Sequence, residues 1–376
     1  MTRLIILIIL LLLSLLAVLR AQAYYLWLMA IAVSEFPLIF AGGTVIMLAT
    51  GFWAGKYQLA GTVVGIIALI LFLSPIFRSY LISRHLQQDM RAAFGPAGLK
   101  KDAVPFSFGK LFRLKFKDTI GSKTLTYVTY GDGTAMKFDF FPAQVPGQRP
   151  CVIVVHGGSW SSGDSKQLAD LNSLLAQKGY NVAAINYRLA PKYQTPAPVE
   201  DIKNAMSFFR THADEFHIDT SQFVLLGRSA GAQIALLAAY TLHDKSIKGV
   251  IEFYGPVDMV WGYSIPSNPL IMDSRKVMGD YVGGPYDKVP QKYHDCSPLF
   301  FTGEDSPPTL MIHGVNDVLV TYLHAVKLSA KLQEDHVKHY WLKLPWATHG
   351  FDFNLYGPGG QLSTYAVGNF LSTVTK

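Results

Sequence analysis

Residues 227–231 read Gly-Arg-Ser-Ala-Gly, which is the pattern G-x-S-x-G. An apolar run at 223–226 leads into this pattern, and a run of small residues at 232–240 follows it. The context matters because glycines permit a tight strand-to-helix turn, which holds a serine hydroxyl above a sheet at the positive end of a helix. We therefore predict that Ser229 is a nucleophile.

A serine is a poor nucleophile unless a base takes its proton and an acid orients that base. In sites of this kind the chain order is serine, acid, histidine. Downstream of Ser229, Asp317 follows an apolar run at 310–312, and His349 follows a further expected strand at 339–344. Ligands bind at the carboxyl ends of the strands in open α/β sheets, so we predict that Asp317 and His349 complete a catalytic triad with Ser229.

Acyl transfer also needs hydrogen-bond donors that face the oxyanion formed during the reaction. Residues 156–160 read His-Gly-Gly-Ser-Trp and follow an apolar run at 152–155. Glycines at this place let backbone N–H groups face a cavity. We predict that Gly158 and Ser159 supply two donors and Ala230 a third, while His156 is interpreted as a structural residue that holds the loop.

The elements that must position these residues form a regular series. Continuous apolar runs alternate with helical stretches, which predicts an α/β fold with a mostly parallel central sheet flanked by helices. The expected strands are 152–155, 182–185, 223–226, 250–254, 309–312 and 339–344, and the expected helices are 167–178, 198–212, 230–243 and 319–335. Alternating polar and apolar residues at 111–116, 125–130 and 136–141 predict an antiparallel edge before them.

Residues 258–308 interrupt this series, because they are irregular and rich in Pro, Gly, Tyr and Asp. A loop of this length inside a compact domain is usually a lid or a binding element. We therefore predict a lid-like insertion within a catalytic domain at 110–376.

The N-terminal part of the chain is too apolar for an ordinary soluble domain. Uncharged runs at 4–19, 37–54 and 59–77 each approach the roughly 20 residues that cross a bilayer as a helix, and a shorter apolar run lies at 23–34. We predict three transmembrane helices, or four if the shorter run also crosses. The alternative for the first run is a signal peptide, since Ala-Gln-Ala at 21–23 resembles a cleavage site.

Positive charge predicts the orientation of this multi-pass membrane anchor. Basic residues are dense after the last apolar run, at Arg78, Arg84, Arg91, Lys100 and Lys101. The catalytic domain is therefore predicted on the cytoplasmic side, with the N-terminus on the same side for four helices and on the opposite side for three. The expected organisation is a transmembrane anchor at 1–77, a juxtamembrane linker at 78–109 and the catalytic domain.

The net charge of the chain is +7. No basic stripe with interleaved aromatic residues is present, so nucleic acid is not an expected partner. A basic face beside anionic lipid headgroups is the simpler interpretation. The two cysteines form no C-x-x-C pair, and so small a number suits a reducing compartment or a protein indifferent to the redox compartment.

Together these motifs resemble the α/β-hydrolases of the esterase/lipase group that includes hormone-sensitive-lipase-like enzymes. Residues 186–191 read Asn-Tyr-Arg-Leu-Ala-Pro and resemble that group's loop after the oxyanion motif, with 196–201 behind it. The resemblance covers roughly residues 120 to 370. It implies a serine hydrolase of carboxylic esters without metal or organic cofactor, and it implies that Arg188 and Asp201 brace the scaffold.

One departure from that group bears on the substrate. Many lipase-like relatives carry His-Gly-Gly-Gly, whereas here the fourth residue is Ser159, followed by Trp160. His-Gly-Gly-x-Trp resembles the arylformamidase-like and isoprenylcysteine-methylesterase-like branches. The sequence thus predicts a membrane-anchored esterase that forms an acyl-enzyme and acts on a lipophilic or membrane-derived ester, for which a lipid-derived ester is one candidate. An amidase or arylformamidase-like hydrolase is the first alternative, and a non-catalytic membrane-bound interaction module is the second.

Overall fold

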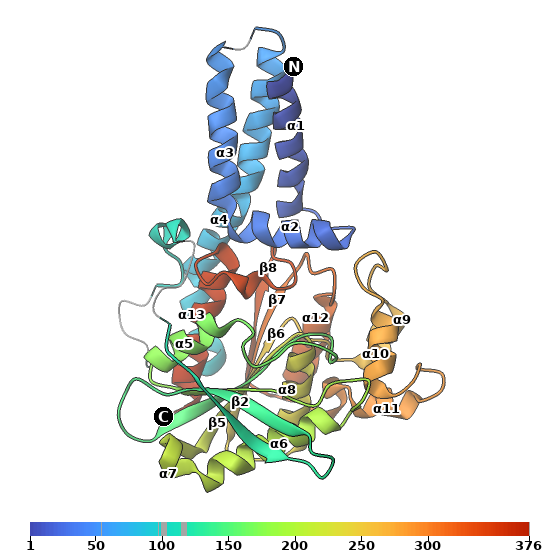
Figure 1. The fold of residues 1–376 in the computed structure, drawn as a ribbon. Coiled ribbons are helices and arrows are strands. Elements are labelled where there is room, and N and C mark those ends of the chain that lie inside the picture. The colour runs from blue at the N-terminus through green and yellow to red at the C-terminus, as the bar shows by residue number, and fades with distance from the viewer. Residues whose placement is uncertain (54, 97, 99–103, 114–118, 376) are drawn as a thin grey trace.

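The computed structural model describes residues 1–53, 55–96, 98, 104–113 and 119–375. Three helices of the N-terminal part, α1 (Thr2–Ser14), α3 (Pro37–Ala49) and α4 (Gln58–Phe94), lie side by side and project from a larger α/β body. Helix α2 (Tyr24–Glu35) lies across the base of this bundle, where the bundle meets the body (Figure 1). Short 3₁₀ turns, η1 (Leu15–Ala17) and η2 (Thr50–Trp53), extend α1 and α3.

The body is built on one eight-stranded sheet with the order β1-β2-β4-β3-β5-β6-β7-β8. β1 pairs with β2 and β2 with β4 in antiparallel fashion, and every other pair is parallel. The strands are β1 (Lys123–Thr129), β2 (Ala135–Phe141), β3 (Arg149–Val155), β4 (Asn181–Ile185), β5 (Ile218–Arg228), β6 (Ile247–Phe253), β7 (Thr309–Gly314) and β8 (His339–Leu344). The expected mostly parallel sheet with an antiparallel edge is confirmed.

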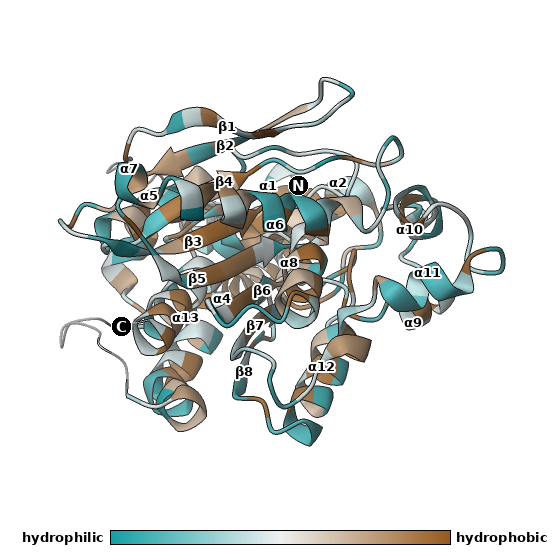
Figure 2. Cartoon of the chain, turned by 90° about the horizontal axis from the view of Figure 1, so that it is seen from below, coloured by the Kyte–Doolittle hydropathy of each residue, from teal (hydrophilic) through white to brown (hydrophobic). Residues whose placement is uncertain are grey.

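Helices cover both faces of the sheet, and the central strands β3, β5 and β6 are buried between them (Figure 2). One face is covered by α6 (Ala197–Thr211), α8 (Ala230–Thr241) and α12 (Leu323–Glu334). The other is covered by α5 (Ala169–Gln177), α13 (Pro358–Val374) and the second half of α4. Phe94 of α4 packs edge-on against Phe370 of α13, with ring centroids 4.8 Å apart. One helix therefore belongs both to the projecting bundle and to the core of the body.

Residues 258–308 form an insertion of short helices beside the carboxyl ends of the strands. They are α9 (Met259–Ser264), α10 (Ser274–Val282), α11 (Pro290–Asp295) and the 3₁₀ turn η4 (Pro298–Phe301). Asp258 and Asp273 cap α9 and α10 by accepting hydrogen bonds from backbone N–H groups. Tyr281 and Tyr293 are fully buried, so this insertion packs onto the body.

One expected strand, at 111–116, is wrong in the residues that the structure describes. Phe108–Phe112 form a 3₁₀ helix, η3, instead, and residues 114–118 lie outside the described ranges. The reason is packing: the ring of Phe108 lies 5.7 Å from that of Tyr80 on α4 and 5.2 Å from that of Phe106. These aromatic side chains contact the long helix rather than the edge of the sheet. The remaining short helices are α7 (Ala213–Phe216) and η5 (Phe351–Phe353).

The apolar N-terminal helices differ in length. Among the described residues, α4 alone is long and apolar enough to cross a membrane as a single helix. The pair formed by α2 and Pro37–Trp53 would count as a second one, although it is bent by 85°. Length and composition thus give one or two candidate helices where the sequence predicted three or four, because α1 is short and the chain turns sharply after Glu35.

Candidate active site

Ser229 occupies the turn between β5 and α8. Its φ is +53° and its ψ is −120°, a conformation that a residue with a side chain rarely adopts outside functional sites. The two glycines of the motif permit the turn. A Cβ on Gly227 would lie 2.2 Å from the carbonyl oxygen of Gly231, and a Cβ on Gly231 would lie 2.3 Å from that of Val155. No side chain larger than hydrogen fits at either place.

Asp317 and His349 meet at the carboxyl edge of the sheet, after β7 and β8. Nδ1 of His349 lies 2.7 Å from Oδ2 of Asp317, and both side chains are buried. The other carboxylate oxygen of Asp317 accepts hydrogen bonds from the backbone N–H groups of Leu319 and Val320, each at 2.9 Å. Burial alone would raise the pKa of Asp317, but His349 and His313 hold it well below its usual range. The carboxylate is therefore charged and fixed in orientation.

A second buried pair lies behind Asp317, and it was not among the residues expected from the sequence. Nε2 of His313 lies 3.4 Å from Oδ2 of Asp317, and its Nδ1 lies 3.9 Å from Oε1 of Glu252. Burial raises the pKa of Glu252 to about 7. Burial opposes the charged form of His313, but Asp317 and Glu252 outweigh it and raise the pKa of His313. Glu252 lies in β6 and His313 in β7. The apolar runs of these strands indicate burial but give no signal for a single titratable residue, so the sequence did not point to this pair.

The loop after β3 presents backbone donors next to Ser229. Gly158, Ser159 and Trp160 all have positive φ, at +122°, +54° and +59°. Gly157 is held by a hydrogen bond from its N–H to Oε1 of Gln167 at 2.8 Å. Within the described part of the chain, the N–H groups of Gly158, Ser159 and Ala230 donate to no protein acceptor. These donors are thus available to a ligand.

His156 lies in the loop and contacts the loop itself. Its Nδ1 lies 2.7 Å from the carbonyl oxygen of Gly157, and its ring stacks on that of Tyr187 with centroids 4.3 Å apart. Burial lowers the pKa of His156, so the ring is neutral and donates from Nδ1. The expected structural role fits these contacts.

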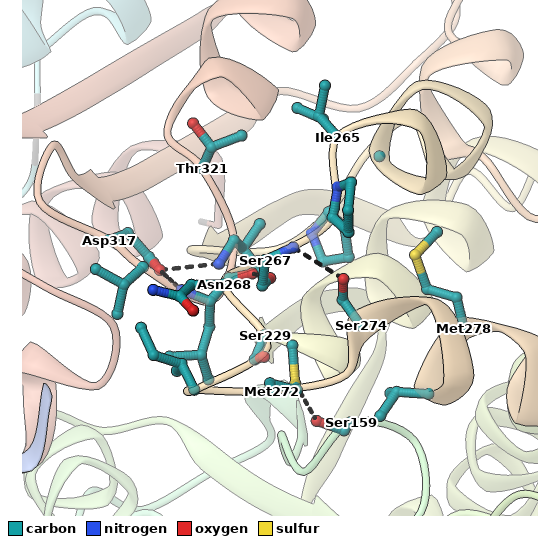
Figure 3. Close-up of a pocket in the computed structure, with 18 of the residues that line it drawn as sticks. Ser159, Ser229, Ile265, Ser267, Asn268, Met272, Ser274, Met278, Asp317 and Thr321 are labelled. Carbon is teal, nitrogen blue, oxygen red and sulfur yellow. Dashed lines mark hydrogen bonds between the residues drawn. The ribbon is translucent and has the colours of Figure 1, made fainter. Parts of the chain in front are cut away.

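Ser229 borders a pocket of about 340 Å³ (Figure 3). Ser159, Ala230 and Asp317 border the same pocket. Met272 of the insertion also lines it, with its sulfur 3.5 Å from Oγ of Ser159. Burial lowers the pKa of His324, which also lines the pocket, to about 3. The imidazole of His324 is therefore neutral, and it adds no charge to the wall that a substrate would meet.

Residues 20–22 also line this pocket, although they belong to the N-terminal part of the chain. Arg20 donates a hydrogen bond to the carbonyl oxygen of Val315 at 3.0 Å, and the carbonyl oxygen of Gln22 accepts one from Asn268 at 3.0 Å. These residues were not expected in the site, because an apolar N-terminus is typical of a membrane region separate from the catalytic domain.

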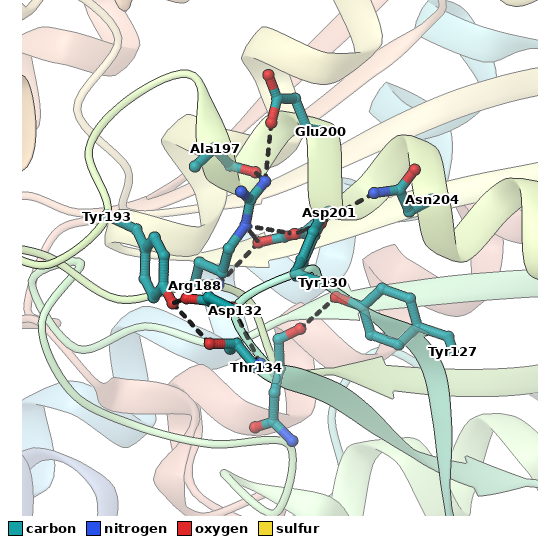
Figure 4. Close-up of polar contacts among 11 residues, drawn as sticks. Tyr127, Tyr130, Asp132, Thr134, Arg188, Tyr193, Ala197, Glu200, Asp201 and Asn204 are labelled. Atoms are coloured by element: carbon teal, nitrogen blue, oxygen red, sulfur yellow. Dashed lines mark hydrogen bonds and ion pairs between the residues drawn. The ribbon is translucent and has the colours of Figure 1, made fainter.

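Arg188 and Asp201 join the segment after β4 to α6 (Figure 4). Nε of Arg188 lies 2.9 Å from Oδ1 of Asp201, and the backbone N–H of Arg188 donates to Oδ2 at 2.7 Å. The guanidinium also lies 4.1 Å from the ring centroid of Tyr130, whose hydroxyl bonds to Asp201. Neither residue borders the pocket of Ser229, which agrees with a role in the scaffold.

No cluster of three or more metal-ligating His, Cys, Asp or Glu side chains occurs in the described ranges. Cys151 and Cys296 are both free and buried. Burial raises the pKa of each thiol well above its usual range, so both are unreactive, small apolar side chains.

Comparison with known proteins gives consistent relatives. Residues 139–332 match the BD-FAE family. Esterase LipC of Mycobacterium tuberculosis is 29% identical over 266 residues, which cover 66% of this chain and 65% of LipC. LipM of the same organism, named as a probable carboxylic ester hydrolase, is 29% identical over 265 residues, which cover 66% of this chain and 60% of LipM.

A solved structure, the Pyrobaculum calidifontis esterase, shares the fold. It superposes with a TM-score of 0.59 at 20% identity, and the match covers 79% of this chain and 97% of that one. The chain thus spans less than two thirds of the length of its mycobacterial relatives, whereas it spans nearly all of this archaeal one.

Proposed function

The chain belongs to the BD-FAE family, and from that premise we propose that it hydrolyses carboxylic esters through Ser229, His349 and Asp317. The observation that carries the proposal is the 2.7 Å contact between His349 and Asp317 at the sheet edge where Ser229 borders the pocket. The names of LipC and LipM, an esterase and a probable carboxylic ester hydrolase, support the same reaction.

In the proposed mechanism, Oγ of Ser229 attacks the acyl carbonyl carbon while Nε2 of His349 takes the hydroxyl proton. Asp317 holds the ring through Nδ1 and stabilises the imidazolium. The tetrahedral intermediate expels the alcohol, which leaves with the proton from His349, and an acyl-enzyme on Ser229 remains. Water then attacks the acyl carbonyl, gives its proton to His349, and releases the acid and Ser229.

The backbone N–H groups of Gly158, Ser159 and Ala230 are proposed to bind the oxyanion. Positive φ angles in the loop after β3 hold the N–H groups of Gly158 and Ser159 in place before substrate binds, and the first residue of α8 carries the third donor. Donors fixed in advance need not reorganise as charge develops, and each is worth about 10²–10³ in kcat in comparable sites. No metal or organic cofactor takes part in this scheme.

We propose that the bundle of α1, α3 and α4 is inserted in a membrane. Large apolar side chains are exposed on it, and two of them, Phe52 and Trp53 in the turn η2 after α3, are 88% and 84% exposed. In water such a surface is unfavourable, whereas in lipid it is not. The basic residues of α4 then favour the cytoplasmic side for the catalytic domain.

The proposed substrate is a lipophilic ester that arrives at the membrane surface. Residues 20–22 border the pocket of Ser229 and join the bundle to α2, so the pocket lies where the body meets the bundle. Two large apolar side chains that are close in sequence to residues lining it are exposed: Tyr25 at 78% and Leu270 at 70%. Tyrosine rings such as that of Tyr25 are enriched at the headgroup level of membranes.

Hydrolysis of p-nitrophenyl esters from acetate to palmitate tests the function. Full-length protein in detergent would be compared with Ser229→Ala and with a matched control, Ser221→Ala, whose serine bonds to Asp219 in the first half of β5, away from the pocket. We expect kcat of Ser229→Ala to fall at least about 10³-fold. The kcat of Ser221→Ala should equal that of the unaltered protein. Equal rates in all three proteins would contradict the proposal, and a matched anilide series would then test the amidase alternative.

A further inference from the structure

Helix α2 makes a line of contacts with the segment that carries His349. Trp27, Ile31 and Glu35 follow one another at intervals of four residues, so their side chains lie on one face of the helix. That face contacts residues 349–360, which run from the proposed catalytic base to the first turn of α13. One face of one N-terminal helix is therefore paired with one loop of the proposed site.

Trp27 contacts the catalytic residue directly. Its indole Nε1–H donates a hydrogen bond to the carbonyl oxygen of His349 at 3.0 Å, and the two rings lie 6.5 Å apart at 60°. The imidazole is held on its other sides by Asp317 and by the ring of Tyr254, whose centroid is 4.3 Å away. Trp27 therefore holds the main chain of His349, whereas Asp317 and Tyr254 hold its side chain.

Glu35 holds the far end of the same segment. Its carboxylate accepts hydrogen bonds from the N–H groups of Gly359 at 2.9 Å and Gly360 at 3.3 Å, at the N-terminus of α13. Its carbonyl oxygen accepts one from Asn354 at 2.9 Å. A Cβ at Gly357 would lie 2.3 Å from the Glu35 carboxylate, so this close approach requires glycine there.

Between these two ends, Ile31 packs near the turn that follows the histidine. Gly350 has φ of +81°, and a Cβ built on it would lie 3.5 Å from Cδ1 of Ile31. One face of α2 thus contacts the segment 349–360 at three places. Trp27 contacts its start, Ile31 lies near Gly350, and Glu35 holds its end. That helix is linked to α3 of the bundle by a single residue, Phe36, at which the chain bends by 85°.

We propose that α2 is the element that positions the catalytic base, with Trp27 as its principal positioning residue. The proposal rests on the hydrolase function proposed above and adds a dependence of that site on the N-terminal helices. Displacement of a reacting group by about 1 Å can reduce the rate of a chemical step about a hundredfold. Loss of the Trp27 hydrogen bond should therefore lower kcat while leaving substrate binding in the pocket intact.

The test compares Trp27→Phe with Trp53→Phe in full-length protein in detergent. Both variants remove one indole N–H and keep an aromatic ring, but Trp53 ends the turn η2 that follows α3 and is 84% exposed. Active enzyme would be counted with a fluorophosphonate that labels Ser229, so that kcat is expressed per reactive serine. We expect Trp27→Phe to lower kcat about five- to tenfold with KM changed less than about twofold, and Trp53→Phe to change neither.

A purely structural role for Trp27 would reduce the amount of active enzyme or its Tm and leave kcat per labelled serine unchanged; that result would overturn the proposal. Hydrogen exchange of amides 349–355 supplies a readout that does not need hydrolysis. Faster exchange there in Trp27→Phe than in Trp53→Phe is expected. If the unaltered protein shows no Ser229-dependent hydrolysis, the proposed function fails, and equal exchange in the two variants would then overturn the positioning role as well.

Discussion

Nε of Arg228 lies 2.6 Å from Oδ2 of Asp352, and both side chains are almost fully buried. Arg228 immediately precedes Ser229, and Asp352 follows His349 by three residues. The hydroxyl of Tyr254 donates to the second carboxylate oxygen at 2.5 Å. This ion pair therefore joins the turn of the proposed nucleophile to the loop of the proposed base.

Removal of the carboxylate from this pair should be strongly destabilising. Asp352→Ala leaves a buried guanidinium without its counter-charge, which typically costs about 3–5 kcal/mol in the free energy of unfolding. Asp244→Ala is the control, because its partner Arg210 is 40% exposed and such pairs contribute about 1 kcal/mol or less. Denaturant unfolding in detergent measures both, and equal losses of stability would contradict the expectation.

Asp317→Asn should retain the fold and lose activity. The amide oxygen can still accept the hydrogen bonds from Leu319 and Val320, but His349 loses the carboxylate that fixes its tautomer and stabilises its charge. We expect kcat for p-nitrophenyl acetate to fall about 10³–10⁴-fold. Asp305→Asn, at an exposed acid near the end of the insertion, should retain the rate of the unaltered protein. A variant of Asp317 that keeps more than about a tenth of the rate would count against the triad.

Gly158→Ala should disrupt the loop after β3, which carries two of the proposed oxyanion donors. Gly158 has φ of +122°, and a Cβ there would lie 2.1 Å from the carbonyl oxygen of Ser162, so the backbone must move. Displaced oxyanion donors are expected to cost about 10²-fold or more in kcat. Gly133→Ala supplies the control, since Gly133 also has positive φ, at +81°, but open space around its Cβ position. Similar losses of activity in both variants would refute the proposal that this loop binds the oxyanion.

The raised pKa of Glu252 predicts how stability depends on pH. The folded protein holds a proton up to about pH 7 on a carboxyl that the unfolded chain releases near the ordinary glutamate pKa of 4.5. This contribution to stability is fully present below about pH 4.5 and is lost as the pH rises to about 7. We expect Glu252→Gln to flatten the decline of Tm between about pH 5 and pH 7, since an amide does not titrate. If Tm fell equally with pH in Glu252→Gln and in the unaltered protein, the raised pKa of Glu252 would be contradicted.

The core of the fold could be predicted from the sequence because buried parallel strands are continuous apolar runs. Such runs at 152–155, 182–185 and 223–226 lie inside β3, β4 and β5. The meeting of Asp317 and His349 follows from the same pattern, since residues after neighbouring parallel strands share one edge of the sheet. Their catalytic roles stay predictions that the variants above test.

Contacts between distant segments could not be predicted in this way. Trp27 and residues 20–22 belong to an apolar stretch whose local pattern indicates only a helix near a membrane. Arg228 is the variable residue before Ser229 in the G-x-S-x-G pattern, and Asp352 lies in the segment after His349. Neither position indicates a partner. Their pairing depends on the tertiary arrangement of β5 and η5, which no local periodicity records.

The hydrogen bond between Trp27 and His349 joins residues 322 positions apart. A ribosome therefore makes α2 long before it makes the loop of His349. On the proposed role of α2, the base is held in place only after both segments have been synthesised and have come together. A hydrolase that is still being translated beside lipid esters would then stay inactive until this long-range contact forms.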